Sequence, residues 1–351
     1  MTAAVLAGAA PPVFASETSN VVRPDDRRLA YEGHWGRTSE VATTVNSGSR
    51  LAFRVTGGTV RLLFDVSTVA VPAQLYVSVD GGEKRLYAVD RDEVTVIAAG
   101  PGPHTVRLSV KDVNSRAERW TPPLRTGVAL TGLRLADGAR LLPQPPRKRM
   151  ELAFYGDSIT QGVMALCDVN TSDCADGTAA YPTLVADALH ARLTQVGFGR
   201  QGVLQTGNGG VPAAPDAYGS NYAGSPAAPD RTADAVVVNQ GTNDAAFPAA
   251  AFRAAYLTYL QQIRAAAPHA RILALRPLNG EHAADIEAVV AQLADSRTEF
   301  VDTSGWTSLA DGDFNGTVHP NTQGHRKVAD HLVPLLQDPR HPRDRNRIGS
   351  S

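Results

Sequence analysis

The stretch Leu152-Ala153-Phe154-Tyr155-Gly156-Asp157-Ser158-Ile159-Thr160 decides how the second half of this chain folds. Its first four residues form a short apolar run, which is typical of a strand buried in a parallel sheet. The glycine relieves the turn out of that strand, so Ser158 follows at the place where a nucleophile is exposed. Because Gly-Asp-Ser also occurs in ordinary turns, this tripeptide alone is weak support for a catalytic serine.

Downstream of Ser158, short apolar runs alternate with segments of helical periodicity. Such alternation predicts an α/β domain with a flavodoxin-like, three-layer α/β/α arrangement, whose sites form at the carboxyl ends of the strands. The expected strands are 152–155, 235–238, 272–275 and 300–301. One helix is expected to begin at Pro182, two more to carry the apolar stripes 252–263 and 286–293, and a last one to span 323–336.

In the first part of the chain, apolar residues alternate with period two from about residue 27 to 142. Asp80-Gly81-Gly82 is the strongest hairpin signal, because glycine supplies the positive φ of a tight turn. Gly57-Gly58 and Gly100-Pro101-Gly102-Pro103 are further turn signals that divide the runs around them. The pattern predicts an antiparallel, jelly-roll-like β-sandwich over residues 27–145, followed by a Pro-rich linker and an α/β hydrolase domain over 146–338.

The two ends of the chain are expected to lie outside these domains. Met1–Ala15 is apolar and uncharged, which indicates the remnant of a signal peptide within residues 1–26; a disordered Ala-rich tail is the alternative. We therefore expect a secreted protein. The stretch 339–351 is expected to be a disordered tail.

The composition limits the classes of partner and cofactor that we expect. The 34 basic and 35 acidic side chains nearly balance, so nothing favours a nucleic acid or an anionic membrane. No apolar run is long enough to span a bilayer. Cys167 and Cys174 are expected to form a disulfide in an exported protein and to be free thiols in a cytosolic one. Two thiols alone cannot hold zinc, and we expect neither a metal nor a cofactor.

Three further segments follow expected strands and carry polar groups. Asn243 in Gln240-Gly241-Thr242-Asn243-Asp244 is placed to donate to an oxyanion, or to form an Asx turn or helix cap. The loop 197–202 offers backbone N–H groups through its glycines, or is plain turn chemistry. His319 in Val318-His319-Pro320-Asn321 precedes the last helix, where a general base would face the nucleophile.

Taken together and in this order, the four segments resemble the SGNH (GDSL) hydrolase superfamily over about residues 151–336. The resemblance implies that Ser158 is the nucleophile and His319 the base. It also implies an oxyanion hole made by the Ser158 backbone N–H, Asn243 and a loop glycine. Gly202 matches that glycine best, and Gly199 is the alternative. Gly197 stands where the family usually has Asn.

One departure concerns the acid of the triad. The family usually has Asp three residues before the histidine, and this chain has Gly316 there. Either Asp313 reaches His319 from the same loop, or a backbone carbonyl fixes the imidazole tautomer in a Ser–His dyad, or the site is inactive.

The order of the two domains resembles carbohydrate esterase family two, which implies an acylated polysaccharide or oligosaccharide as substrate. The leading hypothesis is removal of acetyl or other small acyl groups. The alternatives are a lipase or thioesterase of the same superfamily, or a carbohydrate-binding protein with a degenerate site. Tryptophan mostly fills cores, but Trp35, Trp120 and Trp306 are able to stack on sugar rings. Trp306 precedes the His319 loop and is therefore the best candidate for substrate binding.

Overall fold

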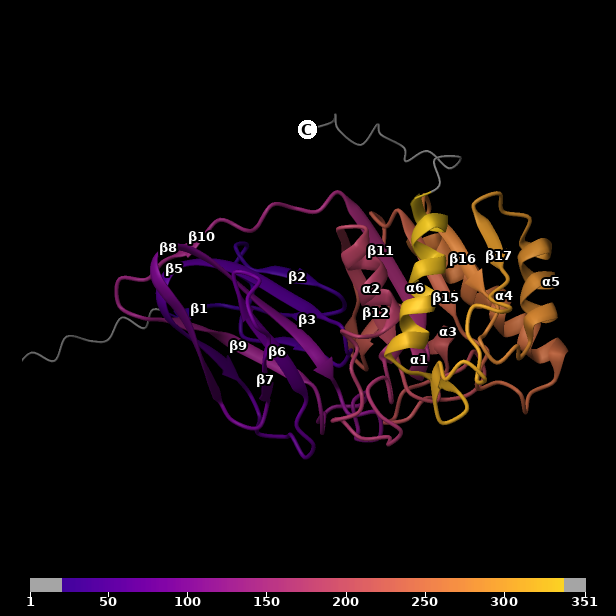
Figure 1. Ribbon diagram of the computed structural model, residues 1–351, viewed down its shortest axis with the longest axis horizontal. Coiled ribbons are helices and arrows are strands. Elements are labelled where there is room, and N and C mark those ends of the chain that lie inside the picture. Colours follow the sequence, from indigo (N-terminus) through magenta and orange to yellow (C-terminus); the bar gives the residue numbers. More distant parts are fainter. Residues whose placement is uncertain (1–20, 338–351) are drawn as a thin grey trace, which may run out of the picture.

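A computed structural model describes residues 21–337, which form two domains side by side along the long axis of the molecule (Figure 1). The proposed signal segment, apart from residues 21–26, and the proposed tail 339–351 lie outside the described residues. Val21 and Val22 already pair with the last long strand of the first domain, upstream of the start expected at residue 27.

The first domain is an antiparallel sheet of ten strands. Seven follow the order β3-β4-β9-β5-β8-β6-β7, while β1 pairs with β9, and β2 and β10 pair with β5. The predicted hairpin is confirmed, because β6 and β7 pair on either side of Asp80 and Gly81, whose φ values are 54° and 74°. The strands are β1 (Val21–Val22), β2 (Ala30–Glu32), β3 (Gly36–Arg37), β4 (Ala42–Thr44), β5 (Arg50–Phe64), β6 (Gln74–Val79), β7 (Arg85–Ala88), β8 (Glu93–Asp112), β9 (Val128–Leu135) and β10 (Leu141–Leu142).

The turns expected at Gly57-Gly58 and at 100–103 are wrong. Both lie inside the long paired strands β5 and β8, where the register shifts between Thr56 and Gly58. A Cβ on Gly57 would lie 1.8 Å from the Gly100 carbonyl oxygen, so these glycines permit a close approach of two strands. The buried positions of β5 change from odd to even across this bulge. Both halves therefore point into one apolar core.

The second domain is a five-stranded parallel sheet in the order β12-β11-β15-β16-β17. Helices α3, α4 and α5 pack on one face, and α1, α2 and α6 on the other, which confirms the predicted three layers. The main strands are β11 (Met150–Gly156), β12 (Ala191–Gly197), β15 (Ala235–Asn239), β16 (Arg271–Leu275) and β17 (Thr298–Val301). The helices are α1 (Ser158–Gln161), α2 (Tyr181–Ala188), α3 (Ala214–Ala217), α4 (Ala249–Ala266), α5 (Ala283–Leu293) and α6 (Thr322–Gln337), and the two small hairpins are β13 (Ser220–Tyr222) with β14 (Ser225–Pro226) and β18 (Phe314–Asn315) with β19 (His319–Pro320).

A buried lysine joins the β-domain to the loop between α1 and α2. Lys111 near the end of β8 is 2% exposed. Its Nζ donates to the carbonyl oxygens of Ser172, Asp173 and Ala175 at 2.6, 3.2 and 2.7 Å. These carbonyls neighbour the disulfide between Cys167 and Cys174, which confirms the predicted bond. Since a buried ammonium group must be satisfied, the loop is held firmly against the β-domain.

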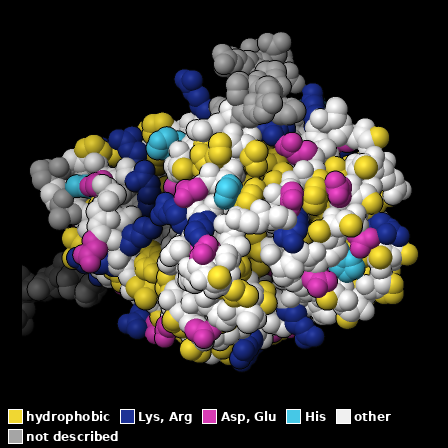
Figure 2. All heavy atoms as spheres, turned by 45° about the vertical axis from the view of Figure 1, so that its right-hand side comes forward, with side chains coloured by type: hydrophobic (Ala, Val, Ile, Leu, Met, Phe, Trp, Pro, Cys, Tyr) yellow, Lys and Arg dark blue, Asp and Glu magenta, His cyan; other side chains and the backbone are white. Residues whose placement is uncertain are grey.

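The surface carries both signs of charge. Figure 2 shows acidic, basic and apolar side chains interspersed on the face that it draws. Within residues 21–337, the helices are all too short or too polar to cross a bilayer.

Candidate active site

Ser158 begins α1 directly after β11. The Asp157 carboxylate caps this helix by accepting the Ile159 N–H at 2.8 Å. Gly156 has no room for a side chain, because its Cβ would lie 2.1 Å from Thr160 Oγ1. The turn therefore requires glycine, as the sequence predicts, and it places Ser158 at the carboxyl edge of the sheet with 6% of its surface exposed.

His319 reaches the same edge from the far end of the chain. It lies in β19, which pairs with β18 so that Asn315 is opposite His319. Its Nε2 lies 3.0 Å from Ser158 Oγ. Burial lowers the pKa of the His319 imidazole, because a charged ring is poorly solvated there. The neutral ring is then available to accept the serine proton.

Asp313 makes no hydrogen bond to His319 in the structure, so this one of the arrangements considered from the sequence is not observed. The Asp313 carboxylate is fully buried and accepts hydrogen bonds from the Ser308 N–H and Lys327 Nζ, both at 2.8 Å, and from Gln323 Nε2 at 3.0 Å. Gln323 and Lys327 are one turn apart on α6, so Asp313 fixes its loop to the start of that helix. Within residues 21–337, His319 Nδ1 has no hydrogen-bond partner.

The backbone and the neighbours of position 316, where the family usually has the acid, are unfavourable for a carboxylate. Gly316 has a φ of 65°, in the left-handed region that favours glycine. A Cβ there would lie 3.6 Å from Oδ1 of Asp168, which belongs to the disulfide loop. The nearby Asn315 side chain donates to the Met164 carbonyl at 2.6 Å. A carboxylate at 316 would therefore meet a second carboxylate.

Asn243 lies beside the turn that carries Ser158, as predicted. Its Nδ2 donates to the Gln201 carbonyl at 3.0 Å and lies 3.4 Å from Asp157 Oδ2. Burial raises the pKa of Asp157 to about 6, and the negative charge of the nearby Asp244 adds to this effect. Hydrogen bonds from the Ile159 N–H and Thr242 oppose it. The side chain of Asn243 is thus held in place by the loop that follows β12 and by the helix cap.

The glycine loop is organised by a second carboxylate. Asp244 accepts the N–H groups of Val203, Leu204 and Gln205 at 2.9, 3.0 and 3.0 Å. A Cβ on Gly202 would lie 2.3 Å from this carboxylate, which is why glycine is needed.

Neither loop glycine has a free donor in this structure. The Gly202 N–H donates to the Gln205 carbonyl at 2.9 Å, and the Gly199 N–H to Gln161 Oε1 at 3.0 Å. A role for Gly202 in the oxyanion hole stays a prediction.

Sequence reasoning missed two residues that support this site from behind. Arg119 of the β-domain is fully buried, and its Nη2 donates to Gln161 Oε1 at 3.0 Å. The same oxygen accepts the Gly199 N–H, so Gln161 joins α1, the glycine loop and the β-domain. The Arg119 guanidinium also lies over the Phe198 ring at 4.9 Å. No local pattern marks Arg119, because only its tertiary neighbours distinguish it from an exposed loop arginine.

Two other side chains near His319 are packed rather than free. Trp306 stacks on His331 of α6 with ring centroids 4.8 Å apart, so one of its faces is covered and its role in substrate binding stays a prediction. His325 is fully buried and its Nδ1 accepts the Tyr181 N–H at 3.3 Å. Burial, followed by repulsion from His319, lowers the pKa of His325 to about 3, so His325 remains neutral. Residues 21–337 contain no cluster of three or more His, Cys, Asp or Glu side chains placed to hold a metal ion.

Comparisons with known proteins concern the α/β domain and the two-domain architecture. The sequence model of the GDSL-like Lipase/Acylhydrolase family matches residues 154–327. No curated protein sequence matches this chain.

Solved structures share the two-domain fold at low identity. A family two carbohydrate esterase from Cellvibrio japonicus is 18% identical with a TM-score of 0.75, covering 91% of this chain and 97% of its own. One from Clostridium thermocellum, in complex with cellohexaose, is 20% identical with a TM-score of 0.70 and coverages of 88% and 98%. An acetyl xylan esterase from Butyrivibrio proteoclasticus is 18% identical with a TM-score of 0.70 and coverages of 89% and 95%. The α/β domain therefore belongs to the GDSL-like lipase/acylhydrolase family, and the chain is a carboxylic ester hydrolase with the two-domain fold of the family two carbohydrate esterases.

Proposed function

We propose that this protein removes acetyl or other small acyl groups from carbohydrate, with Ser158 as nucleophile and His319 as base. The observation that carries the proposal is the 3.0 Å contact between Ser158 Oγ and His319 Nε2 at the carboxyl edge of the parallel sheet. For Nε2 to accept the serine proton, the ring proton must reside on Nδ1.

The mechanism follows from these positions. Ser158 Oγ attacks the ester carbonyl carbon while its proton passes to His319 Nε2, and the Ser158 N–H stabilises the tetrahedral oxyanion. Asn243 joins it by turning one Nδ2 hydrogen to the oxyanion from Asp157, its longer contact at 3.4 Å. The imidazolium of His319 then gives its proton to the departing sugar oxygen as the C–O bond breaks, which releases a sugar hydroxyl and leaves an acyl group on Ser158. Water, deprotonated by His319, attacks this acyl-enzyme and releases the carboxylic acid and free serine.

The proposed substrate class is supported by the proteins that share this fold, and the proposed location by the disulfide. Solved structures of the same fold are named as carbohydrate esterases, one of them an acetyl xylan esterase and another in complex with cellohexaose. We also propose that the protein acts outside the cell, which fits the bonded Cys167 and Cys174 because disulfides persist in oxidising compartments.

Hydrolysis of a chromogenic acetate ester tests the proposal. The wild type is expected to turn over, while Ser158→Ala and His319→Asn fall to background with unchanged thermal unfolding. Equal background rates in wild type and Ser158→Ala would favour a non-catalytic binding protein. A preference for octanoate over acetate esters would instead favour the lipase or thioesterase alternative.

A further inference from the structure

A cavity of about 270 Å³ lies between the two domains and away from Ser158. Its floor is formed by the first residues of β11 and β12, and its walls by the segments 31–37 and 228–233. Ser158 follows the other end of β11, a strand of seven residues, which at about 3.3 Å per residue places the two sites roughly 20 Å apart. A ligand in this cavity therefore does not reach the catalytic serine with the same sugar unit.

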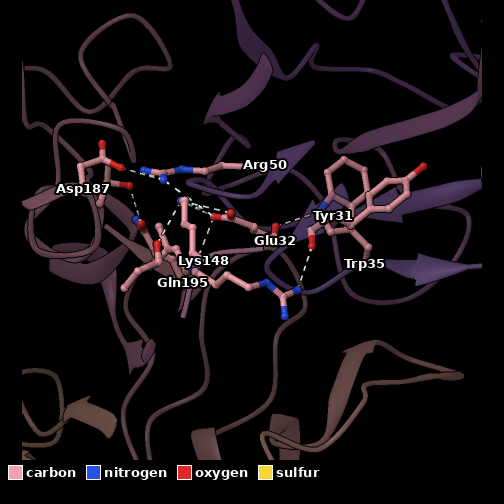
Figure 3. Close-up of polar contacts among 11 residues, drawn as sticks. Tyr31, Glu32, Trp35, Arg50, Lys148, Asp187 and Gln195 are labelled. Carbon is pink, nitrogen blue, oxygen red and sulfur yellow. Dashed lines mark hydrogen bonds and ion pairs between the residues drawn. The ribbon is translucent and has the colours of Figure 1, made fainter. Parts of the chain in front are cut away.

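Two of the three carboxylates around the cavity, Glu32 and Glu151, form ion pairs, and the third, Asp230, accepts a hydrogen bond from Tyr155. Glu32 lies between Lys148 at 3.1 Å and Arg50 at 3.8 Å, as Figure 3 shows. Glu151 pairs with Arg192 at 3.0 Å. The cavity wall consequently has oxygen acceptors and nitrogen donors in fixed positions without a strong net charge.

One cation at the cavity has no ion pair. The Arg37 guanidinium lies over the Tyr31 ring at 5.1 Å and pairs with no carboxylate among residues 21–337. Arg37 is exposed, so its donors remain available to a ligand. This arrangement supplies a donor set that the fold itself does not use.

Two aromatic rings stand beside that cation. Trp35 and Tyr31 are in edge-to-face contact with centroids 5.1 Å apart. Trp35 Nε1 donates to the Glu32 carbonyl at 3.1 Å, which fixes the indole against the cavity wall. Rigid aromatic faces next to polar groups suit a ligand with C–H faces and a hydroxyl-bearing rim.

A buried histidine also lines the cavity. His34 is 7% exposed, and its Nε2 lies 3.4 Å from the Tyr155 hydroxyl, which donates to Asp230. Its Nδ1 faces the Ser220 backbone but meets the geometry of a hydrogen bond with no described residue. This nitrogen is buried against that backbone, so His34 contributes its ring to the cavity wall and not a free hydrogen-bonding group.

We propose that this interdomain cavity binds one unit of a neutral saccharide. A negatively charged ligand would meet the carboxylates of Glu32, Glu151 and Asp230, and a positively charged one would meet Arg37 and Arg192. Sugar hydroxyls are neutral, and they donate hydrogen bonds to carboxylates and accept them from guanidinium groups. The volume is near the lower end of the roughly 300–1,000 Å³ of ligand pockets, which fits one unit rather than a long oligomer. A saccharide unit bound in the cavity would hold the polymer while another unit is deacylated at Ser158. This role rests on the proposed function, whereas the binding itself does not.

Calorimetric titration with xylohexaose and cellohexaose tests the binding in the full chain. The catalytically silent Ser158→Ala variant is expected to bind at least one of them. Adding Arg37→Ala or Trp35→Ala is expected to weaken that binding about tenfold or more, as for central contacts of an interface. Trp35→Phe keeps a ring and should retain part of the affinity, and Arg140→Ala, an exposed arginine outside the cavity, is the matched control. Equal affinity in all variants, or no binding by Ser158→Ala, overturns the inference.

Kinetics separate this inference from the proposed function. On acetylated xylan, Arg37→Ala is expected to raise KM relative to Arg140→Ala, because tethering one sugar unit raises the local substrate concentration. If wild type hydrolyses a small acetate ester but neither hexasaccharide binds, only the cavity proposal fails. If binding depends on Arg37 while the small ester is not hydrolysed, only the proposed function fails.

Discussion

Ser158 Oγ and His319 Nε2 lie 3.0 Å apart, although 161 positions separate the two residues in the sequence. Ser158 is fixed by the turn from β11 into α1, and His319 by the small hairpin of β18 and β19. Their contact depends on the α/β domain being folded, with no side chain from the β-domain taking part directly. The chemistry of this pair leads to four predictions.

The acid limb of activity is expected to have a midpoint below pH 6.5. Burial disfavours the imidazolium form of His319 and lowers its pKa, so the neutral base persists to lower pH than a free histidine. The measurement is kcat/KM for an acetate ester between about pH 4 and 8, the range that brackets ordinary histidine titration. His331→Gln is the control and should keep the same midpoint. A midpoint above 6.5 would contradict this environment for His319.

Asp313→Asn is expected to keep most of the activity and to lose stability. Burial raises the pKa of this carboxyl, but hydrogen bonds from Lys327 and the Ser308 N–H overcome that effect and lower it, so the carboxylate is ionised and paired. Substitution weakens these contacts by about 1–3 kcal/mol of unfolding free energy, as for other buried charged hydrogen bonds. Thermal unfolding and kcat measure the two effects separately. A loss in kcat of about 10⁴-fold would instead identify Asp313 as the group that orients His319.

Gly316→Asp is not expected to increase the activity, although it restores the residue usual in the family. The φ of 65° lies in the left-handed region, which costs most residues with a side chain about 1–2 kcal/mol and costs aspartate and asparagine less. The new carboxylate would also approach Asp168, whose Oδ1 is 3.6 Å from the added Cβ. Gly316→Asn, with the same shape and no charge, is the control. A large gain in kcat for Asp over Asn would show that a missing carboxylate limits the wild type.

Arg119→Lys is expected to lower kcat about tenfold or more with little change in KM, because small displacements of reacting groups are costly. Lysine keeps the charge but cannot reproduce the guanidinium that contacts Gln161 and covers Phe198. Arg116→Lys, at an exposed position of the same loop, is the control. Steady-state kinetics at several substrate concentrations separate kcat from KM. If Arg119→Lys lowers only the melting temperature, Arg119 supports the fold without positioning α1.

The sequence predicted the parts of the site that local geometry dictates. Gly156 and Ser158 follow a buried strand, and the turn between them tolerates no side chain at Gly156. Asn243 follows β15 in the same way, so both were expected at one edge of the sheet. The turns predicted at Gly57 and Gly100 were wrong, because glycine marks a close approach of strands as well as a turn.

The amino-acid sequence by itself determined the two fold classes and the order of the strands and helices in the α/β domain, because periodicity and turn chemistry are properties of neighbouring residues. It also singled out Ser158 and His319 as candidates. Only the tertiary structure decided which groups surround them. It paired Asp313 with Lys327 rather than His319, placed buried Arg119 behind α1, and left an unused donor set at Arg37 between the domains. These contacts join residues far apart in the chain, and their energies depend on burial, which no local pattern records.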